Sequence, residues 1–398
     1  MNADRREGKR SPVLIAGGGV AALELMLGLR RLAGEAVDID LLSPTRDFAY
    51  APLAVAEPFG VEHVRRFGLA EIADEQRACT RVGALAAVDP GRRLAITADG
   101  ASVDYDLLVI ATGARPRESL PGALTFVHEA DRQAFRSLLD ELTEGASRRV
   151  VFAVPGGVVW ALPLYELALM TASYLGARQI GAARLSLVTP EEAPLGLFGA
   201  DASRAVHELL SERGIALHTG TYPAAIGDGC LVVTPGDPLP ADRVVTLPRL
   251  EGPFLPGLPH DAAGFIPTDA HGRVQGVDDV YAAGDVTNFP IKQGGIATQQ
   301  ADAVAEAIAA RAGADVAPQP FRPVLRGLLL TGSTPSYMSA EITGGRGETS
   351  TVDMEPLWWP PSKIAGRYLS HYWARVAAAE PASSGIRIEV DDLEPFLH

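Results

Sequence analysis

Cysteine is nearly absent from this chain of 398 residues, because only Cys79 and Cys230 occur and they lie far apart. Without a CxxC pair the sequence carries neither a dithiol redox motif nor a cysteine-based zinc site. The eight histidines are scattered and form no HExxH pattern. We therefore expect no metal site, and we interpret both cysteines as plain buried thiols.

Positive charge and long apolar runs are also scarce. Lys and Arg number 35 against 49 Asp and Glu, which gives a formal net charge of −14 and argues against nucleic acid as a partner. The longest nearly uncharged apolar run, residues 151–165, is interrupted by glycine and proline and is too short to cross a bilayer. The charged first ten residues lead into a strand and not into a signal peptide. We expect a cytoplasmic protein without a transmembrane helix.

What remains is an ordinary globular composition, with 47% apolar and 21% charged residues. A chain of this length can form two or three domains with substantial cores. Local motifs must therefore indicate the function.

The first motif is a glycine-rich turn between an apolar strand and an apolar helix. Residues 13–15 predict a buried strand, and Gly17, Gly19 and Ala22 follow as GxGxxA before a helical apolar stripe begins. Gly17 permits the turn, Gly19 lets a pyrophosphate approach the backbone, and Ala22 lets the helix pack closely on the strand. The helix N-terminus would then face the phosphates. A purely structural glycine turn is the alternative.

The second predicted strand covers Val37 to Leu42 and ends beside Ser43. Dinucleotide-binding folds usually have an acid at that place for the adenosine ribose. A serine hydroxyl makes a weaker hydrogen bond than a carboxylate. Asp38 and Asp40 are alternatives for the ribose contact, and they are equally compatible with solvated strand positions.

Further elements follow up to residue 115. Residues 47–58 predict a rigid loop because of their prolines and aromatics. We expect a helix over 69–78, strands near 82–88 and 94–96, and a buried strand within 105–115. The turn at Thr112 and Gly113 suits a backbone that lies close to a ligand.

Three motifs in this order resemble one superfamily: GxGxxA from Gly17, YDLLVIATG over 105–113, and VYAAGD over 280–285. The chain resembles the flavoproteins with two dinucleotide-binding domains, the pyridine nucleotide-disulfide reductase superfamily. The resemblance implies FAD as cofactor and a hydrogen bond from Asp285 to its ribityl chain. An alternative role for Asp285, compatible with the first, is the N-cap of a helix.

The resemblance implies an α/β fold with two Rossmann-like domains of the three-layer ββα type and a C-terminal cap. The FAD-binding domain would be discontinuous, over 11–116 and 255–312. The second Rossmann-like domain would cover 117–254, and the cap 326–398. We expect residues 244–275 to be a connector and 313–325 a linker, because both are rich in proline.

The second domain departs from the family pattern. A strand over residues 149–154 leads to Gly156 and Gly157, but Val158, Val159 and Trp160 follow where relatives have a second GxGxxG. Bulky side chains there would keep a pyrophosphate from the backbone. The usual NAD(P)H site therefore looks degenerate, and NAD(P)H binding is left open.

Two groups of relatives share further segments. Residues 155–199 look similar to the sulfide:quinone oxidoreductases and the flavocytochrome c sulfide dehydrogenases. Those enzymes use paired cysteines near the flavin, whereas the matching segments around Trp160 and around 330–337 hold none, so sulfide oxidation by thiolate chemistry is not expected. Residues 47–52 and 296–301 look similar to the type II NADH dehydrogenases.

Lys292 and Gln293 precede a predicted helix over residues 296–312, and two glycines separate them from it. The resemblance implies that this helix N-terminus faces the pyrimidine edge of the flavin, with Lys292 and Gln293 beside it. The positive end of the helix would then favour negative charge on the ring. The alternative is that both residues are solvated loop positions.

The segment 356–376 carries three of the four tryptophans and no acidic residue. A helical wheel over 363–376 gathers its aromatic and aliphatic residues on one side, and places Lys363 on the other. Two interpretations stay open: a helix packed over the flavin or a dimer partner, and an interfacial helix in peripheral contact with a membrane. We also expect a homo-oligomer.

The sequence thus predicts an FAD-dependent oxidoreductase that passes electrons to a quinone-like or other acceptor, with small molecules as donor and acceptor. No acid or base stands out as catalytic. The alternatives are an NAD(P)H dehydrogenase with an atypical nucleotide site and a non-catalytic FAD-binding partner protein.

Overall fold

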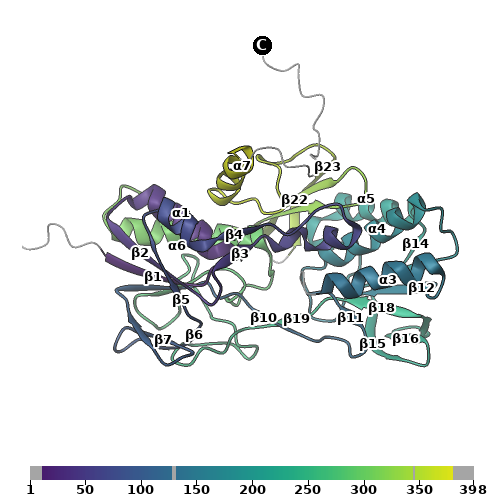
Figure 1. The fold of residues 1–398 in the computed structure, drawn as a ribbon, viewed down its shortest axis with the longest axis horizontal. Coiled ribbons are helices and arrows are strands. Elements are labelled where there is room, and N and C mark those ends of the chain that lie inside the picture. Colours follow the sequence, from purple (N-terminus) through teal and green to yellow (C-terminus); the bar gives the residue numbers. More distant parts are fainter. Residues whose placement is uncertain (1–10, 128–130, 344–345, 380–398) are drawn as a thin grey trace, which may run out of the picture.

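The computed structural model describes residues 11–127, 131–343 and 346–379. Two parallel sheets lie side by side, and a third, antiparallel sheet and a final helix cover one side of the molecule (Figure 1). The part of the predicted cap beyond residue 379 lies outside the described residues.

The first sheet is parallel and has the strand order β20-β9-β1-β2-β5. Its strands are β1 (Ser11–Ala16), β2 (Val37–Ser43), β5 (Cys79–Val82), β9 (Leu107–Ile110) and β20 (Val280–Ala282). The central strands β1 and β9 are almost entirely buried, as expected for a parallel sheet covered on both faces. Because β20 comes late in the chain, this sheet joins residues that are far apart in the sequence.

Helices α1 (Val20–Ala33) and α6 (Gly294–Arg311) lie against each other over this sheet (Figure 1). Gly28 allows their close approach, because a Cβ atom there would lie 3.2 Å from that of Ala305. Smaller elements complete the domain: β3 (Asp47–Ala49), η1 (Ala51–Phe59), β4 (Arg66–Gly68), α2 (Leu69–Glu75), β6 (Leu85–Asp89), β7 (Leu94–Thr97) and β8 (Ser102–Asp104).

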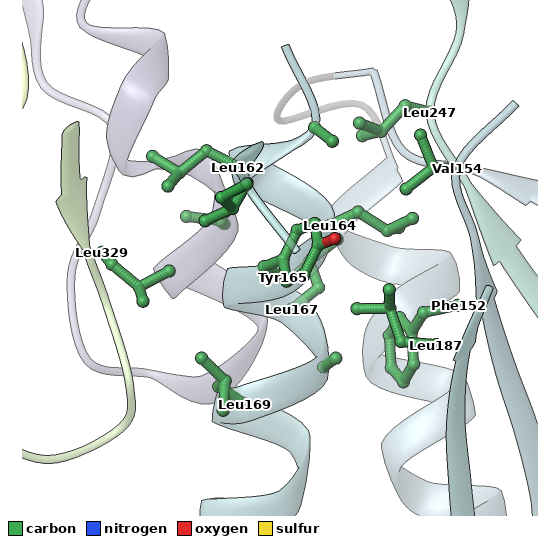
Figure 2. Close-up of a cluster of buried hydrophobic side chains, with 14 of the residues drawn as sticks. Phe152, Val154, Leu162, Leu164, Tyr165, Leu167, Leu169, Leu187, Leu247 and Leu329 are labelled. Atoms are coloured by element: carbon green, nitrogen blue, oxygen red, sulfur yellow. The ribbon is translucent and has the colours of Figure 1, made fainter. Parts of the chain in front are cut away.

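The second sheet is also parallel, with the order β11-β18-β12-β13-β14. Its strands are β11 (Leu124–Thr125), β12 (Arg149–Ala153), β13 (Arg184–Val188), β14 (Ile215–His218) and β18 (Arg243–Thr246), and its helices are α3 (Arg132–Glu144), α4 (Leu162–Ala177) and α5 (Ala200–Glu212). Figure 2 shows its core, where Leu164, Tyr165 and Leu167 of α4 meet Phe152 and Leu187 of the sheet. Leu329 joins this core from the cap.

An antiparallel pair, β10 (Arg115–Arg117) and β19 (Arg249–Glu251), connects the two halves. A small sheet at the edge of the second half contains β15 (Tyr222–Gly227), β16 (Cys230–Thr234) and β17 (Leu239–Pro240). The covering sheet contains β21 (Val324–Leu329), β22 (Ser336–Thr343) and β23 (Arg346–Asp353), and the last helix is α7 (Leu369–Ala379).

Several local predictions were wrong. The rigid loop over 47–58 contains β3 and η1, and the strand over 82–88 is two strands, β5 and β6, separated at Gly83. The connector over 244–275 begins with β18, a strand of the second sheet, which the proline content of the segment concealed. Cys79 is exposed and Cys230 half-buried, so neither is a buried thiol.

Candidate functional site

The carboxyl ends of the central strands of the first sheet meet at one edge. Backbone hydrogen bonds fix the residues that follow these strands: Gly17 N–H to Leu42 O (2.8 Å), Ala111 N–H to Ala16 O (2.8 Å) and Ala283 N–H to Ile110 O (3.0 Å). Gly17 has φ 140°, and a Cβ atom at this position would lie 2.1 Å from Ala111 O. Only glycine fits there, because any side chain would collide with backbone.

The first turn of α1 faces open space. Gly19 is the N-cap of α1 and no side chain caps the helix, while a Cβ at Gly19 would meet nothing within 4 Å. The first backbone N–H groups of a helix require partners, and an uncapped helix N-terminus beside free space is an anion site by geometry. Ala22, one turn later, is completely buried.

Sequence reasoning missed that Gly18 must also be a glycine. A Cβ at Gly18 would lie 2.5 Å from Ser43 Oγ and 2.7 Å from Leu69 Cδ1. Ser43 is 3% exposed and lies against the glycine turn. Asp40 is bound by Arg81 through two contacts of 2.9 and 2.8 Å, so the structure brings Ser43, and not Asp40, to the turn.

Thr112 and Gly113 follow β9 at the same edge of the sheet. Thr112 is exposed, and Gly113 adopts φ 73° with no atom within 4 Å of a Cβ position. The fold therefore places the motif residues Gly19 and Gly113 where backbone is open to a ligand, whereas Gly17 is packed against the backbone of Ala111.

Asp285 lies where α1 and α6 approach each other. It follows Gly284, which has φ 84° and whose N–H donates to Gln300 Oε1 at 2.7 Å; a Cβ at Gly284 would lie 3.0 Å from that of Ala21 on α1. Among the described residues, no donor reaches the Asp285 carboxylate. Burial raises the pKa of Asp285, and the charge of Lys292 opposes this. The helix N-cap alternative is wrong, because Gln293 caps α6.

Gln293 is 7% exposed and serves the fold. Its Oε1 accepts from Ile296 N–H at 2.8 Å, and its Nε2 donates to Arg326 O at 3.0 Å. Lys292 donates to Thr287 O, and its ammonium lies 3.7 Å from the ring centroid of Phe265. Neither side chain is merely solvated, and their predicted contact with the flavin edge stays a prediction.

These features fit FAD. The open N-terminus of α1 suits the pyrophosphate, and the unpartnered Asp285 carboxylate suits hydroxyl donors of a ribityl chain. Gly294 and Gly295 begin α6 at the same edge of the sheet. Gly17, Gly19, Ser43, Gly113 and Asp285 are the residues that would hold the cofactor.

The second glycine turn has a different form. Residues 154–161 separate β12 from α4. Trp160 packs against Phe198, with ring centroids 5.9 Å apart, and Gly156 O accepts from Arg249 Nε at 3.1 Å. Val159 is 37% exposed at the tip. That these bulky residues keep a nucleotide from the turn stays a prediction.

A cleft of about 910 Å³ nevertheless opens at the carboxyl edge of the second sheet. Val158, Val159, Glu191, Leu197, Arg204, His207 and Thr219 are among its lining residues. Glu191 follows β13 and accepts hydrogen bonds from Tyr165 (2.6 Å) and Thr189 (2.8 Å). Burial raises the pKa of Glu191, and these hydroxyls oppose the shift.

The tail brings one more charged group into the interior. Lys363 forms an ion pair with Glu166 of α4, and the two side chains are 6% and 1% exposed. Glu166 also accepts from Leu330 N–H at 2.8 Å. The adjacent Ile364 donates its N–H to Tyr50 Oη at 3.1 Å, and its side chain is 2.9 Å from a Cβ position at Gly294. Sequence reasoning missed this pair, and the residue next to Lys363, Ile364, lies beside the first turn of α6.

The helical wheel over 363–376 was wrong for its first part, because α7 begins at Leu369. Glu24, completely buried on α1, accepts from Tyr368 N–H and Leu369 N–H at 2.8 Å each. This carboxylate from a distant helix binds the first N–H groups of α7, and residues 361–368 before it form no helix. A Cβ at Gly366 would lie 2.5 Å from Glu24 Oε2, so glycine is needed there.

The apolar side of α7 is used for packing. Trp373 stacks on Phe67 and on Phe48, with ring centroids 4.0 Å and 5.5 Å apart. Leu369 is completely buried. Over the described ranges no helix could cross a bilayer. In the described part of the cap, the exposed large apolar side chains are Met354 and Trp359, which are 69% and 75% exposed.

Comparison with known proteins identifies the family. The pyridine nucleotide-disulphide oxidoreductase family matches residues 11–308. A mitochondrial external alternative NAD(P)H-ubiquinone oxidoreductase of Arabidopsis thaliana is 25% identical over 319 residues, covering 70% of this chain and 54% of the relative. A probable ferredoxin reductase of Castellaniella defragrans is 29% identical over 311 residues, covering 73% and 70%. The chain thus spans about half the length of the plant relative.

The fold is also that of solved structures. The sulfide:quinone oxidoreductase of Aquifex aeolicus matches with a TM-score of 0.76 at 21% identity, covering 92% of this chain and 89% of the other. The predicted α/β fold of two Rossmann-like halves, the superfamily and FAD as cofactor are confirmed. This chain therefore belongs to the pyridine nucleotide-disulphide oxidoreductase family.

Proposed function

We propose that this protein passes electrons through FAD to a quinone-like acceptor, from a donor that is not a pyridine nucleotide bound in the usual way. The names of two similar proteins, an NAD(P)H-ubiquinone oxidoreductase and a sulfide:quinone oxidoreductase, support a quinone. The bulky residues Val158, Val159 and Trp160 in the second glycine turn support a donor other than NAD(P)H. The net charge of −14 disfavours a negatively charged carrier protein as acceptor.

The observation that carries the proposal is the buried ion pair of Lys363 and Glu166, next in the chain to Ile364 beside the first turn of α6. A quinone that takes up two electrons also takes up two protons. FAD, when bound, supplies the electron transfer, and the protein must supply a route for protons. Burial raises the pKa of Glu166, while the Lys363 charge lowers it, so this carboxyl is suited to gain and lose a proton.

Neither cysteine takes part in the proposed transfer of electrons and protons. Cys79 lies on β5 and Cys230 on β16, and neither strand carries a residue of α6 or of the ion pair. Gln299 and Gln300 of α6 bind backbone groups of the chain itself, at Val324 and Gly284. Protons for an acceptor therefore come from Glu166 and Lys363 in this proposal.

The test is the reoxidation of dithionite-reduced protein under anaerobic conditions. A short-chain ubiquinone needs protons, whereas ferricyanide accepts electrons alone. We expect Glu166→Gln to slow reoxidation by the quinone about tenfold or more and to leave reoxidation by ferricyanide unchanged. Equal rates for the variant and the parent protein with both acceptors would remove the support for a proton role.

A second candidate is an NAD(P)H dehydrogenase with an atypical nucleotide site. The 910 Å³ cleft beside Glu191 favours it, because nucleotides bind at the carboxyl edge of parallel sheets. Anaerobic mixing with NADH and with NADPH separates the candidates: rapid bleaching of the flavin absorbance supports the dehydrogenase. Stoichiometric FAD without turnover with any quinone or dye would instead indicate a non-catalytic FAD-binding protein.

A further inference from the structure

Tyr50 is a buried tyrosine whose hydroxyl hydrogen meets no acceptor in the described part of the chain. The residue follows β3, precedes η1 and is 8% exposed. Its Oη accepts the N–H of Ile364 at 3.1 Å. A phenol hydroxyl can both accept and donate, and buried polar groups are nearly always hydrogen-bonded. The hydrogen of this hydroxyl is therefore left for a group that does not belong to the chain.

The carbonyl group of Ile364 does not take this hydrogen, because two other hydroxyls already bind it. Ser362 Oγ donates to Ile364 O at 2.7 Å, and Ser370 Oγ donates to the same oxygen at 2.6 Å. The tail thus satisfies its own carbonyl with its own serines. Tyr50 serves the tail as an acceptor and keeps its donor.

The Tyr50 hydroxyl is joined through one residue to the groups that the proposed function uses. Ile364, which binds it, packs on the first turn of α6, with Cγ1 2.9 Å from a Cβ position at Gly294. The preceding residue, Lys363, forms the ion pair with Glu166. Glu166 Oε2 is buried and, like the Tyr50 hydrogen, has no partner over the described ranges. An unused donor and an unused acceptor are therefore connected by the single peptide between residues 363 and 364.

Burial also fixes the protonation state of Tyr50. It raises the pKa of the phenol to about 12, and the backbone N–H groups of Ile364 and Lys363 oppose this shift only in part. The hydroxyl is therefore protonated near neutral pH and acts as a hydrogen-bond donor, not as a source of protons.

We propose that Tyr50 binds the electron acceptor, with its hydroxyl donating a hydrogen bond to a carbonyl oxygen of the quinone-like molecule. This inference rests on the proposed function. A quinone carbonyl oxygen accepts hydrogen bonds and donates none, which matches an unused donor. The bond strengthens as the oxygen gains negative charge during reduction. Tyr50 binds and orients the acceptor, whereas Glu166 and Lys363 supply the protons.

The test is the equilibrium binding of a short-chain ubiquinone to the oxidised holoprotein, measured by quenching of tryptophan fluorescence with no electron donor present. Tyr50→Phe removes the hydroxyl alone, and we expect the Kd for the quinone to rise about fivefold. The matched control is Tyr105→Phe. Tyr105 is 3% exposed, its hydroxyl has no partner among the described residues, and it precedes β9 at the amino end of that strand. This control should leave the Kd unchanged.

A ring-fluorinated tyrosine at position 50 separates binding of the acceptor from support of the tail. A single ring fluorine lowers the pKa of the phenol, so the hydroxyl becomes a stronger donor and a weaker acceptor. Because the pKa of Tyr50 is about 12, the fluorinated hydroxyl still carries its proton at about pH 7. We expect the Kd for the quinone to fall below that of the parent protein. A hydroxyl that only accepts from Ile364 N–H would give the opposite change.

An unchanged Kd in Tyr50→Phe, or a parent protein that does not bind the quinone, would overturn the inference. If Tyr50→Phe does not fold, the fluorinated protein decides, and a Kd equal to or above that of the parent counts against the donor role. The proposed function fails separately, when the quinone binds with the expected pattern of Kd values but does not reoxidise the reduced protein. Rapid reoxidation with an unchanged Kd in Tyr50→Phe would contradict the role of Tyr50 alone.

Discussion

The two glycine turns of this protein stand at equivalent places in two parallel sheets, but they differ in length and in the side chains beside them. In the first, Gly17–Gly19 alone separate β1 from α1, and the helix N-terminus is open. In the second, residues 154–161 separate β12 from α4, and Trp160 packs against Phe198. The comparison teaches that two Rossmann-like halves can share a parallel sheet while the turns after their first strands differ in length and in side chains.

The same two halves hold the tail by different buried acids. In the first half Glu24 accepts two backbone N–H groups at the start of α7. In the second half Glu166 binds the charged Lys363. One contact is a helix cap and the other an ion pair, so their responses to mutation and to pH should differ.

The largest expected effect separates the two turns directly. Gly17→Ala places a Cβ 2.1 Å from Ala111 O at a φ of 140°, and we expect the purified protein to hold less than about a tenth of its FAD. In the control Gly156→Ala, the nearest atom to the Cβ is Tyr222 Cδ1 at 3.7 Å, so FAD should be retained. The ratio of flavin to protein absorbance measures both, and a yellow, stoichiometric Gly17→Ala protein would contradict the cofactor site.

The ion pair comes next. Lys363→Met leaves Glu166 buried and unpaired, so we expect a loss of about 3–5 kcal/mol in the free energy of unfolding, measured by urea titration. Adding Glu166→Gln to this variant should recover much of the loss. The control is Arg375→Met, which breaks an exposed bridge to Glu75 and should cost less than about 1 kcal/mol. Equal losses in both single variants would show that burial of the pair is unimportant.

The second turn can be opened. Trp160→Ala removes the ring that packs on Phe198, and if this ring excludes the nucleotide, reduction of the flavin by NADH should accelerate about tenfold. Stopped-flow absorbance of the flavin measures the rate. Trp359→Ala, at a side chain that is 75% exposed in the cap, is the control. A parent protein already reduced rapidly by NADH would contradict the comparison between the turns.

A smaller effect concerns pH and the first half. Burial, and then the nearby Glu24 carboxylate, raise the pKa of Asp302 well above its ordinary value of 3.8. The folded state therefore keeps a proton that the unfolded chain releases, and stability falls as the pH rises above that value. Asp302→Asn removes this loss, so its melting temperature should exceed that of the parent by a few degrees at about pH 8 and not at about pH 4. A difference in melting temperature between the variant and the parent that is the same at both pH values would show that Asp302 does not hold a proton in the folded state.

The smallest expected effect concerns the membrane. Met354 and Trp359 are exposed on the cap, and such side chains insert at an interface. We expect the double variant Met354→Ser and Trp359→Ser to reduce flotation with phosphatidylcholine and phosphatidylglycerol vesicles about twofold. The melting temperature should not change. If the parent protein does not float, peripheral membrane contact is abandoned.

Much of the site was predictable because its signals are local in the sequence. A strand, three glycines and a helix in succession predict a tight turn between the strand and the helix. Gly17 and Gly19 are the residues on which this prediction rests. Gly18 was missed because its constraint comes from Ser43 and Leu69, which the sheet brings to it. Lys363 was assigned to a polar helix face because periodicity describes a segment in isolation, and its partner Glu166 is on another domain.

The sequence by itself predicted the apolar strands and the glycine turn after the first of them, because these signals depend on neighbours along the chain. The arrangement of the strands in two sheets and the role of Asp285 were implied by the family resemblance. The tertiary structure alone decided that α7 begins at Leu369, that Lys363 is buried against Glu166, and that Glu24 binds the first turn of α7. These properties depend on side chains that meet across elements far apart in the sequence, where burial and charge are set by packing and not by local pattern.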